Sequence, residues 1–336
     1  MVAPLISVKA GFFSLIMALS ILTLNCNGIR DQSKRAGLVQ WLQSLPVGAD
    51  IVCLQETHCL SSAECSSWFP SSGFSVVVSP GSSHSCGCIV LFCPSLSLVN
   101  SWCDVLGRYL QVEFSFFGKS FRVCCVYAPN RNPARDQFFG DLHSKIDPSI
   151  PTILCGDFNE VFDRSVDRAG SDPSVSSRDS SSSLKYLFDD CCVVDIWRYL
   201  HPSSVGFTWT RWDGSLASRI DLFGVPFWWV PVSSCSFVPC PFSDHCGVLL
   251  SCSIPDAVPP GPGIWKLNIS VLDDPEYVEL ISNAWRSWRN SVSRFPSLVK
   301  WWDGGKSLIK GLTIRYCCGK AGARSPGPSG PVDRSP

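Results

Sequence analysis

The chain has 336 residues, of which 45% are hydrophobic and 12% aromatic, and it carries 28 basic and 28 acidic side chains. This apolar content supplies a sizeable core and excludes a globally disordered chain. The balanced charge excludes a general electrostatic attraction to nucleic acid or to a membrane surface.

The first predicted element is an apolar run near the N-terminus, residues 11–24. It is shorter than the roughly 20 apolar residues that a membrane-spanning helix needs. It follows Lys9, as a signal peptide would, but no small-residue cleavage pattern precedes the turn that begins at Asn25. We therefore expect residues 1–19 to be an ill-defined hydrophobic leader and the end of the run to be a buried strand. A signal peptide is the alternative.

Short apolar runs that end in turn residues continue through the first 250 residues. Their β-branched and aromatic content predicts strands over 51–54, 74–78, 88–92, 121–127, 152–155 and 247–252. Apolar residues at helical spacing predict helices over 33–45, 136–146 and 181–188, the first of them capped by Ser33. Strands and helices mixed in this way predict two packed sheets with helices outside.

The composition changes after the last of these strands. Residues 254–263 are rich in proline and glycine, as in a linker, and residues 275–288 can form a helix. Residues 264–324 hold 10 basic and 5 acidic side chains, whereas residues 1–263 hold 17 and 22. A basic segment suits contact with a polyanion, and the alternative is that it is an ordinary solvated surface. An acidic main body suits a cation site. Residues 324–336 are predicted to be a disordered tail.

The nineteen cysteines form no pair of Cys-x-x-Cys units, so the pattern does not support a structural zinc site. Disulfide frameworks are typical of small secreted domains with little core, and this chain is neither small nor poor in core residues. We expect most of the cysteines to be reduced and to pack as small hydrophobic side chains.

Several predicted strands end in a polar residue that could bind a metal ion or a phosphate. Glu56 follows 51–54, and Mg²⁺ is usually held by one or two carboxylates. Asp157 and Asn159 follow 152–155, and in an extended segment residues two apart point the same way. Asp221 could orient His245 as a base or a phosphate-polarising group. Each of these motifs taken alone is also compatible with an ordinary turn or a solvated strand end.

Taken in order, the motifs resemble the endonuclease/exonuclease/phosphatase superfamily. The match is closest to the N-terminal, apurinic-endonuclease-like domain of the polyproteins of LINE-type non-LTR retrotransposons. The motifs are LTLNCNG, VCLQETH, CVYAPN, ILCGDFNEVFD, VVDIWRYLHP, GFTWT, SRIDLF and FSDHCGVLLS. The resemblance implies an α+β fold, a four-layer α/β/β/α sandwich of two mainly antiparallel sheets like that of deoxyribonuclease I. It covers residues 20–253, and residues 254–323 resemble the linker that precedes reverse transcriptase, whose own motifs are absent.

The resemblance also implies a metal site and a cofactor. Glu56 would be the main Mg²⁺ ligand, with Asn25 beside it, and Asp244 would complete the shell. Mn²⁺ can substitute for Mg²⁺ in such a site.

The same resemblance assigns catalytic roles. Tyr127 would contact the scissile phosphate, and Asp157, supported by Asn159, would align or deprotonate the attacking water. His245, hydrogen-bonded to Asp221, would act on the phosphate.

Three further residues would bind the substrate, namely Thr208, Ser243 and Asn130. The implied activity is nicking of double-stranded DNA to leave a 3′-OH, as in target-primed retrotransposition. We expect a monomer that is not secreted, does not bind membranes and is located in the nucleus, with the cytoplasm as a further location. Two alternatives are a phosphatase or phosphodiesterase of the same fold acting on another phosphoester, and a non-catalytic retroelement remnant.

Overall fold

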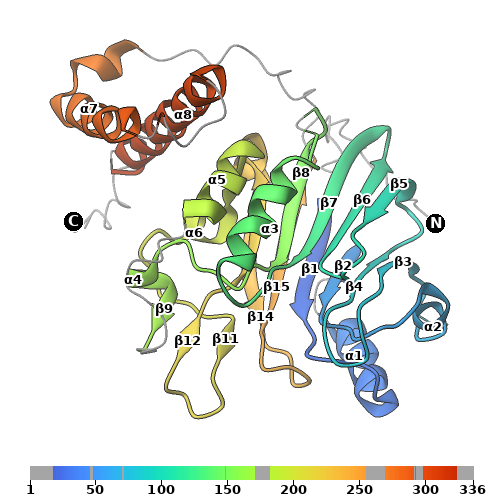
Figure 1. Ribbon diagram of the computed structural model, residues 1–336. Coiled ribbons are helices and arrows are strands. Elements are labelled where there is room, and N and C mark those ends of the chain that lie inside the picture. Colours follow the sequence, from blue (N-terminus) through green and yellow to red (C-terminus); the bar gives the residue numbers. More distant parts are fainter. Residues whose placement is uncertain are drawn as a thin grey trace, which may run out of the picture. The chain divides into compact units, whose positions relative to one another are not determined.

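A computed structural model describes residues 18–45, 48–69, 72–147, 149–170, 182–254, 269–290, 292 and 298–323 (Figure 1). Nearly all of the expected leader and the whole expected tail lie outside these residues. The chain divides into two compact units, Met1–Gly261 and Pro262–Pro336.

The first sheet of the larger unit brings the two ends of that unit together. Its order is β14 (Ser233–Val238), β15 (Gly247–Ser253), β1 (Ala18–Asn25), β2 (Ile51–Gln55), β4 (Cys88–Phe92) and β3 (Ser75–Ser79). The β1–β2 pair is parallel and the other pairs are antiparallel. Ala18 of β1 lies opposite Ser253 of β15, so the last strand of the unit pairs with the first.

The second sheet has the order β10 (Val193–Asp195), β13 (Asp221–Pro226), β8 (Thr152–Asp157), β7 (Lys119–Tyr127), β6 (Tyr109–Phe116) and β5 (Ser97–Cys103). The β7–β8 pair is parallel and places Tyr127 beside Asp157. The sequence pattern did not predict β5, β6, β10, β13 or β14. The residues of β5 are all exposed, and an exposed edge strand lacks the buried apolar run by which the other strands were predicted.

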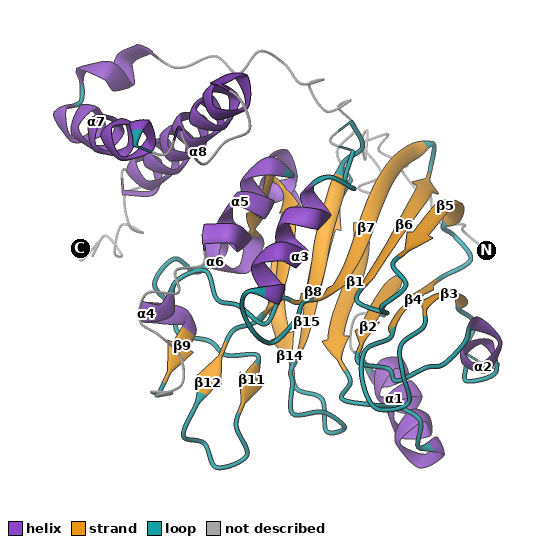
Figure 2. Ribbon diagram, in the orientation of Figure 1, coloured by secondary structure: helices purple, strands orange, loops and turns teal. Residues whose placement is uncertain are grey.

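Helices cover the outer faces of both sheets (Figure 2). Leu38 and Leu42 of α1 (Gln32–Ser44) belong to the core on the first sheet, where α2 (Ser62–Ser66) contributes Cys65. Phe139 of α3 (Ala134–His143) and Leu187 of α5 (Ser182–Asp190) belong to the core on the second sheet. A third core fills the space between the sheets. The expected four-layer α+β sandwich is therefore confirmed.

The first helix begins differently from the prediction. Asp31 is its N-cap, and its Oδ1 accepts the backbone N–H of Lys34 at 2.8 Å. The expected cap at Ser33 is wrong, because Ser33 already lies in the first turn.

Most of the cysteines are buried, and each one whose side chain is described is a free thiol. This agrees with their expected role as small core residues.

A small third sheet lies beside the end of the sandwich where β1, β2 and β8 end. It consists of β11 (Trp209–Thr210), β12 (Ala217–Ser218) and β9 (Arg168–Ala169), which directly follows α4 (Arg164–Asp167). A backbone bridge between Trp209 and His245 connects this sheet to the turn before β15. The remaining elements of this unit are α6 (Ile196–Leu200) and a 3-10 helix, η1 (Phe227–Val232).

The smaller unit contains a 3-10 helix, η2 (Ile269–Asp273), and two α-helices, α7 (Pro275–Arg289) and α8 (Leu298–Ala323). Asp274 caps α7, and a buried hydrogen bond of 2.7 Å joins Tyr277 of α7 to Thr313 of α8. No helix within the described residues has both the length and the apolar character needed to cross a membrane.

Candidate active site

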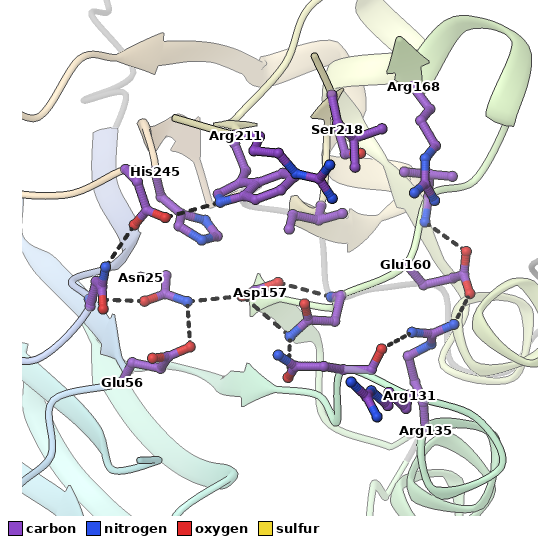
Figure 3. Close-up of a pocket in the computed structure, with 18 of the residues that line it drawn as sticks. Asn25, Glu56, Arg131, Arg135, Asp157, Glu160, Arg168, Arg211, Ser218 and His245 are labelled. Atoms are coloured by element: carbon purple, nitrogen blue, oxygen red, sulfur yellow. Dashed lines mark hydrogen bonds and ion pairs between the residues drawn. The ribbon is translucent and has the colours of Figure 1, made fainter. Parts of the chain in front are cut away.

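The two sheets meet at a cluster of polar side chains where β1, β2 and β8 end. Asn25 is the last residue of β1, Glu56 follows β2, and Asp157 is the last residue of β8. The Asn25 amide Nδ2 donates to Glu56 Oε1 at 3.2 Å and to Asp157 Oδ2 at 2.9 Å (Figure 3). One amide therefore fixes carboxylates from two different sheets.

The backbone at this cluster is held in an unusual conformation. Asn27, Glu56 and Asn159 all have positive φ angles, of 45°, 50° and 49°. Non-glycine residues adopt this left-handed region at an energetic cost, and such residues concentrate at functional sites. The backbone N–H of Gly28 donates to the carbonyl of Glu56 at 2.7 Å, which helps to hold the Glu56 turn in place.

His245 and Asp221 form a buried pair at the same end of the sandwich. Nδ1 of His245 lies 2.8 Å from Oδ2 of Asp221. Burial acts to lower the pKa of His245, but the charge of Asp221, its hydrogen bond and the charge of Asp157 outweigh burial and raise the pKa to about 10. The imidazole is therefore protonated at neutral pH.

Asp157 is 1% exposed. Burial, followed by the charge of Asp221, raises its pKa to about 7, although His245 and Asn25 act in the opposite direction. The backbone N–H of Asn159 donates to Asp157 Oδ1 at 2.8 Å, and the Asn159 amide donates to Asn130 Oδ1 at 3.3 Å. A carboxyl group with a pKa near neutrality can exchange a proton at physiological pH, as a general base must.

Asp244 is exposed and is held by two uncharged donors. Asn27 Nδ2 donates to its Oδ1 at 3.1 Å, and Trp209 Nε1 donates to its Oδ2 at 3.0 Å. The backbone N–H of Asn27 in turn donates to Asn25 Oδ1 at 3.0 Å. A continuous set of hydrogen bonds thus runs from Glu56 through Asn25 and Asn27 to Asp244.

Tyr127 lies 5% exposed between the sheets. Burial, then the charge of Glu56 and a hydrogen bond to it, raise the pKa of the phenol well above its usual range. The guanidinium of Arg108 lies 4.9 Å from the centre of the ring. The phenol therefore remains a proton donor and is directed at Glu56, and its expected contact with a phosphate stays a prediction.

Two residues that are expected to bind the substrate contact the protein backbone. Thr208 is 1% exposed, and its Oγ1 accepts the N–H groups of Ile220 and Asp221 at 3.1 and 3.0 Å. Ser243 Oγ donates to the carbonyl of Asn25 at 2.6 Å and accepts the N–H of His245 at 3.1 Å. Both hydroxyl groups therefore hold the backbone beside Asn25, Asp221 and His245, and their expected contact with the substrate stays a prediction. The contact between Ser243 and Asn25 could not be seen in the motifs, because the two residues are far apart in the sequence.

A cleft of about 810 Å³ opens over the cluster. Besides Asn25, Glu56, Asn130, Asp157, Asn159, Asp244 and His245, it is lined by five arginines: Arg131, Arg135, Arg164, Arg168 and Arg211. In Figure 3 the labelled arginines lie on the side of the cleft away from Glu56. No sequence pattern marks these arginines, because they lie on different elements and loops and form no run in the sequence.

The residues of the cleft fit a hard divalent cation. Glu56, Asn25 and Asp244 offer carboxylate and amide oxygens, the donors that Mg²⁺ prefers. Asp157, Asp221 and His245 also present ligand atoms within 4.8 Å of one another, and the buried Oδ1 of Asp221 has no hydrogen-bond partner. In this second group, however, the hydrogen bond between His245 and Asp221 already occupies one atom of each.

A two-sheet sandwich with carboxylates and a His–Asp pair in an arginine-lined cleft defines a phosphoester hydrolase of the nuclease or phosphatase type. The chain belongs to the endonuclease/exonuclease/phosphatase family, whose sequence profile matches residues 22–293. It is also 33% identical over 321 residues to the transposon TX1 uncharacterized 149 kDa protein of Xenopus laevis. That match covers 92% of this chain and 24% of the relative, so the chain spans about a quarter of the relative's length.

Solved structures share the fold at lower identity. The AP endonuclease LMAP of Leishmania major is 21% identical with a TM-score of 0.59, covering 71% of this chain and 88% of its own. The APE2 catalytic domain of Xenopus laevis is 20% identical with a TM-score of 0.57, covering 72% and 95%. A 3′ phosphatase from Neisseria, solved with a product DNA hairpin, is 20% identical with a TM-score of 0.56, covering 70% and 99%. Together with the transposon relative, these likenesses confirm the resemblance drawn from the motifs.

Proposed function

We propose that this chain is a Mg²⁺-dependent endonuclease that hydrolyses one phosphodiester of double-stranded DNA and leaves a 3′-OH and a 5′-phosphate. The observation that carries the proposal is the convergence of Asn25, Glu56, Asp157 and the Asp221–His245 pair at one end of the sandwich. The similarity to a transposon protein supports DNA as the substrate.

The proposed roles follow from the geometry and the charge of each group. Asp157, whose pKa is about 7, accepts a proton from the attacking water. Asn159 holds the Asp157 carboxylate through its backbone N–H. Protonated His245 faces the phosphate and stabilises the negative charge that develops there.

Glu56, Asn25 and Asp244 would hold the cation. Bound Mg²⁺ supplies positive charge that offsets the charge on the leaving oxygen. We further propose that Mn²⁺ replaces Mg²⁺ in this role and that the enzyme acts as a monomer in the nucleus.

The arginines favour a polynucleotide over a small phosphoester. A guanidinium group binds phosphate through paired N–H donors, and arginines on separate loops, such as Arg131 and Arg211, suit successive phosphates. Arg131 comes from the loop before α3, and Arg211 from the loop after β11. A small phosphoester would occupy the catalytic end without needing the arginines beyond it.

Nicking of supercoiled plasmid tests the proposal. We expect the full chain to produce open circles with Mg²⁺ but not with a chelator, and DNA polymerase to extend the nicked strand, which requires a 3′-OH. We expect Glu56→Ala, Asp157→Ala and His245→Ala to abolish nicking. His143→Ala is the matched control, because His143 lies on α3 outside the cleft.

Equal nicking by the wild type and by a variant that carries all three substitutions would refute the proposal. If the plasmid stays intact while a terminal 3′ phosphate or a small phosphoester is hydrolysed, the alternative phosphatase function is correct. If no substrate reacts and the folded protein still binds duplex DNA, the chain is a non-catalytic remnant.

A further inference from the structure

Asp244 is the exposed member of the proposed cation ligands, and an exposed carboxylate is normally free to rotate. Here each of its oxygens accepts one hydrogen bond, from Asn27 at 3.1 Å and from Trp209 at 3.0 Å. The two donors lie far apart in sequence and hold the carboxylate from two sides. Its orientation is therefore determined by the protein before any ligand binds.

Trp209 is itself firmly placed. It belongs to β11, its backbone bridges to His245, and its half-buried ring lines the cleft. The neighbouring Thr208 accepts the backbone N–H of Cys246 at 2.7 Å, which ties β11 to the turn that carries Asp244. These backbone contacts, on the residues next to Trp209 and Asp244, keep the indole N–H beside the Asp244 carboxylate.

The chemistry of the two donors suits a cation ligand. An indole N–H and an amide N–H are neutral, so they orient a carboxylate without neutralising its charge. Each carboxylate oxygen has two lone pairs, so one hydrogen bond leaves one lone pair on each oxygen. A lysine or arginine in the same place would compete with a cation for the negative charge.

We propose that Trp209 is a positioning residue that, together with Asn27, orients Asp244 toward a divalent cation. This inference rests on the proposed function, because it takes Asp244 as a cation ligand. Groups that orient metal ligands through hydrogen bonds commonly change metal affinity by about 10- to 100-fold when they are removed.

Binding of Mn²⁺ alone to the full chain, measured by electron paramagnetic resonance of the free ion, tests the inference without any nuclease reaction. Trp209→Phe keeps a ring but removes the N–H, and we expect it to weaken Mn²⁺ binding by about 10-fold or more. Trp212→Phe is the matched control: Trp212 is 93% exposed in the same hairpin, and its replacement should leave binding unchanged.

A variant that lacks the Asp244 carboxylate shows whether Trp209 acts through the orientation of Asp244 or through a general effect on the fold. In Asp244→Asn, we expect Trp209→Phe to cause no additional loss of Mn²⁺ binding, because the carboxylate it orients is gone. Asn27→Ala should weaken binding in the same way as Trp209→Phe, and it carries the test if Trp209→Phe fails to fold.

Three results would overturn the inference: unchanged Mn²⁺ binding in folded Trp209→Phe, an equal loss in the Asp244→Asn background, or wild-type binding no tighter than that of Asp244→Asn. The nicking assay is independent of these measurements. A chain that binds Mn²⁺ in the expected way but cuts no DNA would refute the proposed function and leave the role of Trp209 intact.

Discussion

His245 and Asp221 lie 2.8 Å apart although they belong to different sheets, His245 just before β15 of the first sheet and Asp221 at the start of β13 of the second. The bond between Asn25 of β1 and Asp157 of β8 also joins the two sheets. The active site therefore lies at the interface between the two sheets, and it forms only when the sheets are packed face to face.

The pair determines the pH range of the reaction. Asp221 raises the pKa of His245 to about 10, and it also helps to raise the pKa of Asp157 to about 7. We expect wild-type activity to rise through pH 7 as Asp157 loses its proton, and to fall near pH 10 as His245 loses its own. In Asp221→Asn both pKa values decrease, so the whole profile should move to lower pH.

At pH 7.5 we expect Asp221→Asn to lower kcat/KM by about 10²- to 10⁴-fold. Nuclear magnetic resonance of the imidazole in the metal-free protein checks the cause directly. A pKa of His245 near 10 in Asp221→Asn would contradict the assigned role of Asp221.

Thr208→Val tests whether Thr208 holds the backbone or binds the substrate. The substitution keeps the shape but removes the acceptor of two backbone N–H groups, those of Ile220 and Asp221. Each buried N–H group left without a partner costs roughly 1–3 kcal/mol. We expect the free energy of unfolding, measured with urea, to fall accordingly. Thr210→Val, at the exposed neighbour in β11, should leave it unchanged. If Thr208→Val instead raises KM for DNA at unchanged stability, Thr208 is a substrate contact.

Arg219 holds the third sheet against the second. Its guanidinium makes two bonds to Asp167 and two to Asp195, at 2.6–3.1 Å, and it is 1% exposed. Replacement by Met leaves two buried carboxylates without their main partner, and breaking such a pair costs about 3–5 kcal/mol. We expect a loss of this size in urea unfolding.

The acid dependence of stability should change as well. Burial acts to raise the pKa of Asp167, but the hydrogen bonds and charges of Arg219 and Arg198 together outweigh burial and lower the pKa. A carboxyl group whose pKa is lower in the folded state stabilises the fold at pH values above its pKa in the unfolded state. This stabilisation is lost as the pH falls through the pKa of the folded state. In Arg219→Met this loss on acidification should be smaller than in the wild type. An equal loss would show that Arg219 does not govern Asp167.

Arg131 tests the proposed contact with the DNA backbone. It is exposed and lines the cleft. Each phosphate that a protein contacts contributes about 0.9 to the slope of log affinity plotted against log salt concentration. Arg131→Ala should lower that slope by about this amount, measured from binding of a DNA duplex at several salt concentrations. Lys185→Ala, exposed on α5 and outside the cleft, is the control. An unchanged slope would exclude a phosphate contact at Arg131.

The segment after β15 is expected to be dispensable for nicking. The larger compact unit ends at Gly261, and all residues of the cleft lie before it. A chain shortened to residues 1–253 should therefore nick plasmid at the same rate as the full chain. A shortened chain that folds, as judged by circular dichroism, but does not cut would contradict this.

The sequence allowed the sandwich and the charged site residues to be predicted, for a physical reason. Buried strands such as β2 and β8 are continuous apolar runs, and a charged residue directly after such a run is conspicuous. The roles of Ser243, Thr208, Asn27 and Trp209 could not be predicted, because each depends on a partner brought close only by folding. The edge strand β5 was missed because exposed residues carry no hydrophobic pattern.

The pairing of β1 with β15 has a consequence for how the protein is made. The ribosome synthesises β1 early and β15 last among the strands of the sandwich. The edge of β1 that pairs with β15 therefore stays unpaired while the chain between the two strands is synthesised. Asn25 and Glu56 are made early too, but Asp244 and His245 emerge just before β15. We therefore expect the nascent chain to be inactive until β15 has left the ribosome and paired with β1.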